Sequence, residues 1–398
     1  MAIPLALSRR RDYAGPVLFS YGFRPFFLGA GIWSASAILL WVRAYFGEIA
    51  LPVAMGPLDW HMHEMIFGYA AAVIAGFLLT AIPNWTGRLP VNGWPLASLV
   101  ALWLAGRVAI YFAVVIGPLV AAAIDISFLV VLAATALREI VSGKNWNNLR
   151  VLVILLALVA ANVVWHLEIL WRGAGTYGPR MALGAVIVLI TLIGGRIIPS
   201  FTRNWLTRKN PGRLPQPLSR FDMLAVAAGV VSLVAWIAFP ASVPAGVLLL
   251  LAGGLHAVRL ARWAGDRTVT DRLVLVLHVA YAFVPAGFLL LGSAILWPLA
   301  IAPSAGIHAW STGAIGLMTL AVMTRASLGH TGRPLAASYA TQLVYALVLI
   351  AALVRIAAAS LGANDLLHVA AIAWVAGFAG FVLAYGPLLL MKQPAWTA

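Results

Sequence analysis

The sequence contains no cysteine and few charged residues. The absence of Cys from all 398 residues excludes disulfides, thiolate-bound zinc, iron–sulfur clusters and c-type haem attachment. Any bound metal must therefore use His, Met, Asp, Glu or Tyr. Charged residues make up 9% of the chain and hydrophobic residues 63%, whereas soluble domains carry about 25% charged residues. Most of the chain must lie in a lipid bilayer rather than in water.

Acidic residues are scarcer still, with 11 Asp and Glu against 26 Lys and Arg and a net charge of +15. In a soluble protein such a charge would favour binding to nucleic acid. Here the basic residues lie in short segments between apolar stretches, without interleaved aromatic side chains. This is the distribution of cytoplasmic loops, so we expect no nucleic-acid partner.

Twelve stretches are long enough for a bilayer-crossing helix, which needs about 20 mostly apolar residues. Their ranges are 24–46, 60–83, 94–116, 118–138, 149–171, 180–201, 221–239, 243–264, 272–297, 303–325, 336–359 and 365–390. Because the loops are short, we predict an all-α integral membrane protein with a single transmembrane domain over residues 1–398. Arg and Lys gather at the N-terminus and in every second loop, which places both termini of a multi-pass membrane protein in the cytoplasm.

Two of these stretches resemble each other. The segment from His63 to Arg88 aligns without gaps with the segment from His308 to Arg333, 245 positions later, and six of 26 positions are identical. Both segments end in Thr-Gly-Arg. The sixth stretch shares Gly184-Ala185, Arg196 and Thr202 with this pattern. Recurrence every four helices predicts three pseudo-symmetric four-helix repeats.

Two histidines at equivalent depths of a repeated helix are what an axially bis-ligated haem needs. We therefore predict His63 and His308 as axial ligands of a b-type haem in the outer leaflet. The other interpretation is that each histidine hydrogen-bonds a nearby carbonyl and fixes helix packing. Polar residues inside a bilayer are costly and usually functional.

A copper site is predicted among the other histidines of the outer half. His61 lies about 200° around a helix from His63 and shares a face with Glu64, while His166, followed by Glu168, lies at similar depth. Imidazole and carboxylate are suitable copper ligands. We consider His61, His166 and His368 the copper ligands, with Glu64 beside them; the alternative is a His/Glu cluster solvated from the periplasm.

Three histidines lie toward the cytoplasmic side. His256 and His278 have matching depth on an antiparallel pair of helices and are candidate ligands of a second haem or metal, with His330 as a third member. Alternatively they are packing residues. Arg196 and Arg203 are candidates for binding haem propionates or for simple anchoring. Arg107 and Asp125 flank a tight Gly-Pro turn and are predicted to form an intramembrane ion pair; otherwise Arg107 would hold a propionate.

Several long motifs resemble one known family. They are Gly22-Phe23-Arg24-Pro25-Phe26-Phe27, His61-Met62-His63-Glu64-Met65-Ile66-Phe67-Gly68-Tyr69, Gly195-Arg196-Ile197-Ile198-Pro199-Ser200-Phe201-Thr202-Arg203-Asn204-Trp205 and Leu328-Gly329-His330-Thr331-Gly332-Arg333. Together they resemble the NnrS family over nearly the whole chain. The resemblance implies a haem- and copper-containing protein of the bacterial inner (cytoplasmic) membrane that acts in nitric oxide metabolism, denitrification and tolerance to nitrosative stress.

The sequence is compatible with three kinds of function, of which one is an enzyme. No triad, phosphate loop or nucleotide domain is visible in the sequence, so one or two haems and copper would carry any chemistry. One interpretation is a membrane oxidoreductase that acts on nitric oxide or a nitrosyl species, with quinol or another membrane electron donor. The others are a transporter of a metal, haem or nitrosyl complex, and a haem-based nitric oxide sensor.

Overall fold

The chain folds almost entirely into helices. The computed structural model describes residues 13–392, and within that range no residue is in a β-strand. In this described part of the chain, twelve helices are long and apolar enough to cross a membrane, and each overlaps one predicted span, so the predicted all-α membrane fold is confirmed. A helix satisfies its backbone N–H and C=O groups within a single segment, as the water-free bilayer core requires.

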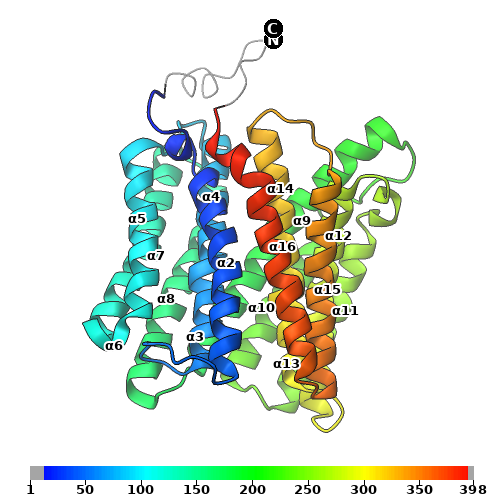
Figure 1. Cartoon of the computed structure of the whole chain (residues 1–398). Helices are drawn as coiled ribbons and strands as arrows, with labels where there is room; N and C mark the ends of the chain where they lie inside the picture. Colours follow the sequence, from blue (N-terminus) through cyan, green and yellow to red (C-terminus); the bar gives the residue numbers. More distant parts are fainter. Residues whose placement is uncertain (1–12, 393–398) are drawn as a thin grey trace. The chain divides into compact units, whose positions relative to one another are not determined.

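The helices group into two compact units, each described by itself. Within the described residues, unit 1 comprises 13–182, Val322–Pro334 and 378–392. Its helices, labelled in Figure 1, are α2 (Phe23–Tyr45), α3 (Pro57–His63), α4 (Ala71–Thr86), α5 (Gly93–Tyr111), α6 (Ala113–Ile116), α7 (Pro118–Ser142) and α8 (Leu149–Arg172). Short 3-10 helices are η1 (Val17–Ser20) and η3 (Trp146–Asn148).

Unit 2 comprises Leu183–Ala321 and Leu335–Gly377. It contains α10 (Arg220–Ala238), α11 (Val243–Ala261), the 3-10 helix η4 (Gly265–Thr268), α12 (Arg272–Leu296), α13 (Pro303–His308) and α15 (Tyr339–Leu361). Three helices have residues in both units: α9 (Tyr177–Lys209), α14 (Leu317–His330) and α16 (Asp365–Leu390). The single domain expected over residues 1–398 stays a prediction.

Close helix contacts in unit 1 frame its polar interior. The helix α7 packs against α5, α4 and α8, and α2 packs against α3 and α4. A Cβ atom on Gly106 of α5 would lie only 3.2 Å from the Cα atom of Asp125 on α7. Glycine at this position thus lets the two backbones approach closely, which brings α5 side chains next to Asp125.

Two spans are interrupted by a π-helix directly after a histidine. The helix α3 ends at His63 and continues as the π-helix η2 (Glu64–Ala70), and α13 ends at His308 and continues as the π-helix η5 (Ala309–Gly316). Both α3 and α13 begin at proline, a residue that suits the first helical position. Single-turn π segments are frequent at functional sites. The two histidine-bearing spans therefore share a backbone feature as well as a sequence pattern.

The third proposed member of this repeat lacks that feature, because α9 is continuous α-helix from Tyr177 to Lys209. The threefold repeat stays a prediction. So does the cytoplasmic location of the termini, which falls on residues 1–12 and 393–398, outside the described residues.

The orientation can be tested because the chain has no native cysteine. Lys144 and Trp171 are exposed near opposite ends of α8, so single variants Lys144→Cys and Trp171→Cys report the two sides of the membrane. In spheroplasts, a membrane-impermeant maleimide should label Trp171→Cys and should reach Lys144→Cys only after the membrane is opened. The reverse labelling pattern would invert the topology.

Candidate metal centre

Unit 1 contains a buried cluster of polar and charged side chains. Its members come from five different helical segments, and none is more than 6% exposed. They are His63 at the end of α3, Glu64 at the start of η2, Arg107 on α5, Asp125 on α7, and Asn162 and His166 on α8. Since charged side chains are costly inside a bilayer unless they are paired, the geometry of this cluster decides what it can do.

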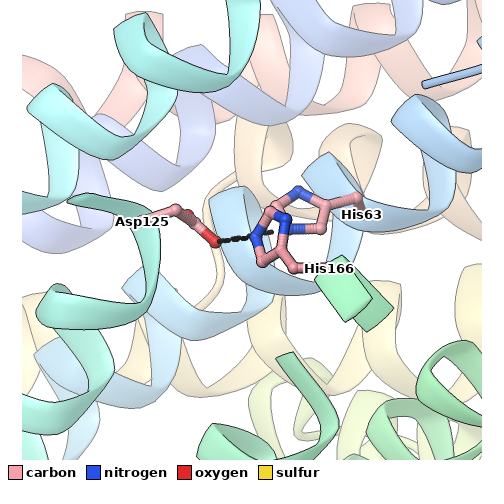
Figure 2. Close-up of side chains that lie close together, drawn as sticks. All are labelled: His63, Asp125 and His166. Atoms are coloured by element: carbon pink, nitrogen blue, oxygen red, sulfur yellow. Dashed lines mark hydrogen bonds and ion pairs between the residues drawn. The ribbon is translucent and has the colours of Figure 1, made fainter. Parts of the chain in front are cut away.

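Asp125 contacts most of the other members of the cluster. Its Oδ2 atom lies 3.3 Å from His63 Nε2 and 3.1 Å from His166 Nε2, and it accepts a hydrogen bond of 2.8 Å from Asn162 Nδ2. Figure 2 shows the carboxylate facing both imidazole rings. Asn162 and His166 reach it together because residues four apart lie on the same helix face.

Arg107 links the two carboxylates. Its Nη1 atom donates to Glu64 Oε1 over 2.6 Å, and its Nη2 atom donates to Asp125 Oδ1. The predicted ion pair between Arg107 and Asp125 is thus present, with Glu64 as a second acidic partner. Guanidinium suits this role because its planar donors can bind two oxygen groups at once.

The surroundings of His63 call for a second cation. Its Nδ1 atom lies 3.1 Å from Glu64 Oε1, and its Nε2 atom lies 3.2 Å from Asn162 Oδ1 as well as close to Asp125. All of these neighbouring oxygen atoms are acceptors, whereas a neutral imidazole carries one N–H and one lone pair. Two carboxylates also face only one guanidinium. A proton or a metal ion between His63 and Asp125 would balance both the charge and the hydrogen bonding.

The donor atoms suit a small metal ion. One atom each from His63, Asp125 and His166 lie within 4.8 Å of one another. With metal–ligand bonds of about 2.1 Å, tetrahedral ligands lie about 3.4 Å apart, close to the two distances between Asp125 and the histidines. The contact between His63 Nδ1 and Glu64 is the carboxylate–histidine arrangement that fixes the tautomer of metal-binding histidines.

Packing around η2 holds His63 and Glu64 in place. Trp103 Nε1 on α5 donates to the carbonyl oxygen of Gly68 over 2.8 Å. A Cβ atom on Gly68 would lie 2.4 Å from Trp33 Nε1 and 2.8 Å from Glu64 Oε2. The absence of a side chain at Gly68 therefore leaves room for the Glu64 carboxylate, whose other oxygen contacts His63 and Arg107.

The other predicted copper ligands lie elsewhere. The His61 ring stacks on Trp41, with centroids 4.0 Å apart, which fits the expectation that His61 and His63 face different directions. His368 is exposed in unit 2. Glu168 accepts hydrogen bonds from the backbone N–H groups of residues 176–178 and so caps the start of α9. Among the described residues, the group of three suited to a metal contains His63 and His166 but neither His61 nor His368.

His308 belongs to unit 2, whereas His63 belongs to unit 1. The Nδ1 atom of His308 lies 2.7 Å from the carbonyl oxygen of Ser304. A carbonyl accepts only, so Nδ1 carries the proton and Nε2 keeps a lone pair for a metal. The carbonyl hydrogen bond that the packing interpretation expects is thus present at His308. It is also compatible with haem ligation through Nε2. The bis-histidine pairing with His63 stays a prediction.

The inner histidines take separate partners. His256 Nδ1 lies 2.9 Å from the Tyr281 hydroxyl, and His278 Nε2 lies 2.8 Å from the Thr202 hydroxyl. His330 packs its ring against Tyr21 and Phe23 in unit 1, whereas His256 and His278 lie in unit 2. A second haem at these residues stays a prediction.

The two basic candidates for propionates differ in their surroundings. Arg196 is exposed, and Arg203 donates to the carbonyl oxygen of Pro215 over 2.5 Å. The contact of Arg203 with Pro215 links the end of α9 to the following loop. Binding of a haem propionate by Arg196 or Arg203 stays a prediction.

Among known protein families, the family model described as NnrS protein matches residues 17–393 of the chain. The chain belongs to the NnrS family. Membership of the NnrS family confirms the resemblance carried by the sequence motifs and supports a nitric-oxide-related membrane protein. No curated protein matches the chain.

Arg107 offers a test of the cluster's charge balance. The variant Arg107→Leu leaves Glu64 and Asp125 buried without their guanidinium, and breaking a buried pair in this way costs about 3–5 kcal/mol. We expect a matching loss in the free energy of unfolding, measured by titration with SDS in mixed micelles.

The control is Arg43→Leu, which removes an exposed ion pair with Glu48. Exposed pairs contribute at most about 1 kcal/mol. Equal losses in the two variants would show that the buried cluster does not depend on Arg107.

Proposed function

We propose that this NnrS-family protein binds haem and copper in the bacterial inner membrane and carries out redox chemistry in nitric oxide metabolism, contributing to tolerance of nitrosative stress. We assign copper to the centre formed by His63, Asp125 and His166. The observation that carries this assignment is the convergence of these three donors, within 4.8 Å of one another, on one buried position.

The chemistry of the donors favours copper. Imidazole binds copper, zinc, iron and nickel well, and among divalent first-row metals copper forms the most stable complexes with a given set of nitrogen and oxygen ligands. Two histidines with one carboxylate also hold non-haem ferrous iron in many oxygenases. Iron at the same three residues is therefore the second candidate, and metal analysis separates the two.

The surrounding residues would set the properties of the bound metal. Glu64 would hold His63 through its Nδ1 atom so that Nε2 faces the ion, and Asn162 would orient Asp125 through its amide. Arg107, bonded to both carboxylates, would keep the charge of the centre fixed. Such supporting partners matter for metal affinity, and their loss typically costs 10–100-fold.

For haem, the residue on which the assignment rests is His308. Its Nδ1–H is directed to the Ser304 carbonyl, so Nε2 would be the atom that holds a b-type haem. When bound, haem would supply one-electron transfer, with quinol or another membrane electron donor as the source and nitric oxide or a nitrosyl species as the acceptor. The sequence-based pairing of His308 with His63 competes with the copper assignment, because Nδ1 of His63 contacts Glu64 and its Nε2 would face the copper ion.

A transporter of metal, haem or a nitrosyl complex is the alternative function, together with a haem-based sensor. The cluster argues for a resident metal rather than cargo. Each carboxylate in it is fixed by Arg107, and Asp125 is also fixed by Asn162. A transport site must release its ion, which so many fixed contacts oppose.

Metal content tests the copper assignment. The protein purified in detergent should contain copper, measured by mass spectrometry, and His166→Ala and Asp125→Asn should each lose it. Reduced wild-type protein mixed anaerobically with nitric oxide should change its absorption spectrum. The spectral change should be smaller in His166→Ala, because this variant lacks copper.

The matched controls are His61→Ala and His368→Ala, which remove the other predicted ligands and should keep copper. Loss of copper in these two variants, with retention in His166→Ala, would move the site to the group expected from the sequence. If the protein instead contains non-haem iron, and His166→Ala and Asp125→Asn lose it while the two controls keep it, the metal at this centre is iron rather than copper. A protein with neither metal would favour transport.

A further inference from the structure

A tyrosine in the interior of unit 2 has a buried base and a buried cation on its hydroxyl group. Tyr281 of α12 and His256 of α11 are both 0% exposed. The hydroxyl oxygen lies 2.9 Å from His256 Nδ1 and 2.9 Å from Arg259 Nη1. These contacts lie in a different unit from the candidate metal centre and are independent of the copper assignment.

The direction of these hydrogen bonds follows from the groups themselves. Guanidinium only donates, so the Tyr281 oxygen accepts from Arg259. If His256 also donated to that oxygen, the tyrosine proton would be buried without an acceptor, which costs free energy. With the Tyr281 O–H donating to Nδ1 of a neutral His256, the hydroxyl and the guanidinium both have partners, and the N–H at His256 Nε2 is left without a hydrogen bond.

Arg259 is itself fixed in place. Its Nε atom donates to Asp222 Oδ1 over 3.2 Å, and its Nη1 atom donates to the carbonyl oxygen of Thr191 over 3.0 Å. A Cβ atom on Gly195 would lie 2.0 Å from Arg259 Nη2, so glycine at this point of α9 makes room for the guanidinium. Asp222 offsets the charge of Arg259 beside the phenol.

Aromatic rings continue from this pair in both directions. On one side Tyr281 contacts Trp263, with centroids 4.5 Å apart, and Trp263 contacts His278 at 6.5 Å. On the other side the His256 ring stacks on Phe288 at 5.5 Å, and Phe288 contacts Trp310 at 4.8 Å. Trp310 follows His308 by two residues in sequence. All of these rings are at most 6% exposed, except that of His308, which is half-buried.

We propose that Tyr281 is a one-electron redox site with His256 as its proton acceptor. A one-electron oxidant, such as an oxidised metal centre or a radical oxide of nitrogen, takes one electron from the phenol and is reduced by one electron. The O–H bond of Tyr281 breaks as an N–H bond forms at His256 Nδ1. The products are a neutral tyrosyl radical, an imidazolium and the reduced oxidant, and a returning electron reverses both transfers.

Three features distinguish this tyrosine from one held only for packing. Its hydroxyl proton is directed at a base that can take it, its burial excludes water from the radical, and neighbouring rings give the electron a route through unit 2. A purely structural hydrogen bond needs the first contact but gains nothing from the row of rings.

The test generates the radical with light. The full-length protein in detergent is mixed with ruthenium tris-bipyridine and an electron acceptor, illuminated and frozen, and its EPR spectrum is recorded. We expect a tyrosyl signal that changes when the protein contains ring-deuterated tyrosine. The signal should be lost in Tyr281→Phe and reduced severalfold in His256→Gln, whose amide can accept a hydrogen bond but cannot take up the proton.

The matched control is Tyr339→Phe, because Tyr339 is 92% exposed in the same unit; it should keep the buried, long-lived signal. All variants are compared as folded, monodisperse protein. A full signal in Tyr281→Phe would overturn the site, and an unchanged yield in His256→Gln would overturn the proton acceptor. Loss of iron or copper from His256→Gln would also overturn the proposal, because His256 would then be a metal ligand.

Discussion

The buried network of Arg107 with Glu64 and Asp125 is the constraint on which the rest of unit 1 depends. In a bilayer neither carboxylate could stay ionised without a nearby cation, and one guanidinium neutralises only one of the two. The net negative charge that remains on the two carboxylates lies close to His63. Oxygen atoms of both Asp125 and Asn162 lie next to its Nε2 atom. The same shortage of positive charge that makes the cluster costly makes it a suitable place for a cation.

How much of this could be predicted from the sequence differs between the fold and the site. Hydropathy located all twelve spans, because a bilayer imposes one length and one composition on each helix. The pairing of Arg107 with Asp125 also followed from sequence, since both flank one short turn. Their link to Glu64 did not, because contacts between distant helices depend on rotation about each helix axis, which depth alone does not give.

The metal centre shows this limit most clearly. The sequence identified His63, Glu64 and His166 as candidates but grouped His166 with His61 and His368, which lie at similar depth. It assigned Asp125 a structural role alone and missed Asn162. The available signal was the spacing of four residues between Asn162 and His166, which places an amide and an imidazole on one helix face. That signal becomes specific only when Asp125 is known to lie opposite.

The π-helices have a consequence for comparisons with other members of the family. A turn that closes from residue i to i+5 holds one more residue than an α-helical turn, so the faces before and after η2 are out of phase with a continuous helical wheel. The same shift occurs at η5. Loss of one residue from either segment would swing the preceding imidazole around the helix while leaving the hydropathy and the topology of the span unchanged. A relative with such a deletion would look like an intact membrane protein while its histidine pointed at the wrong neighbours.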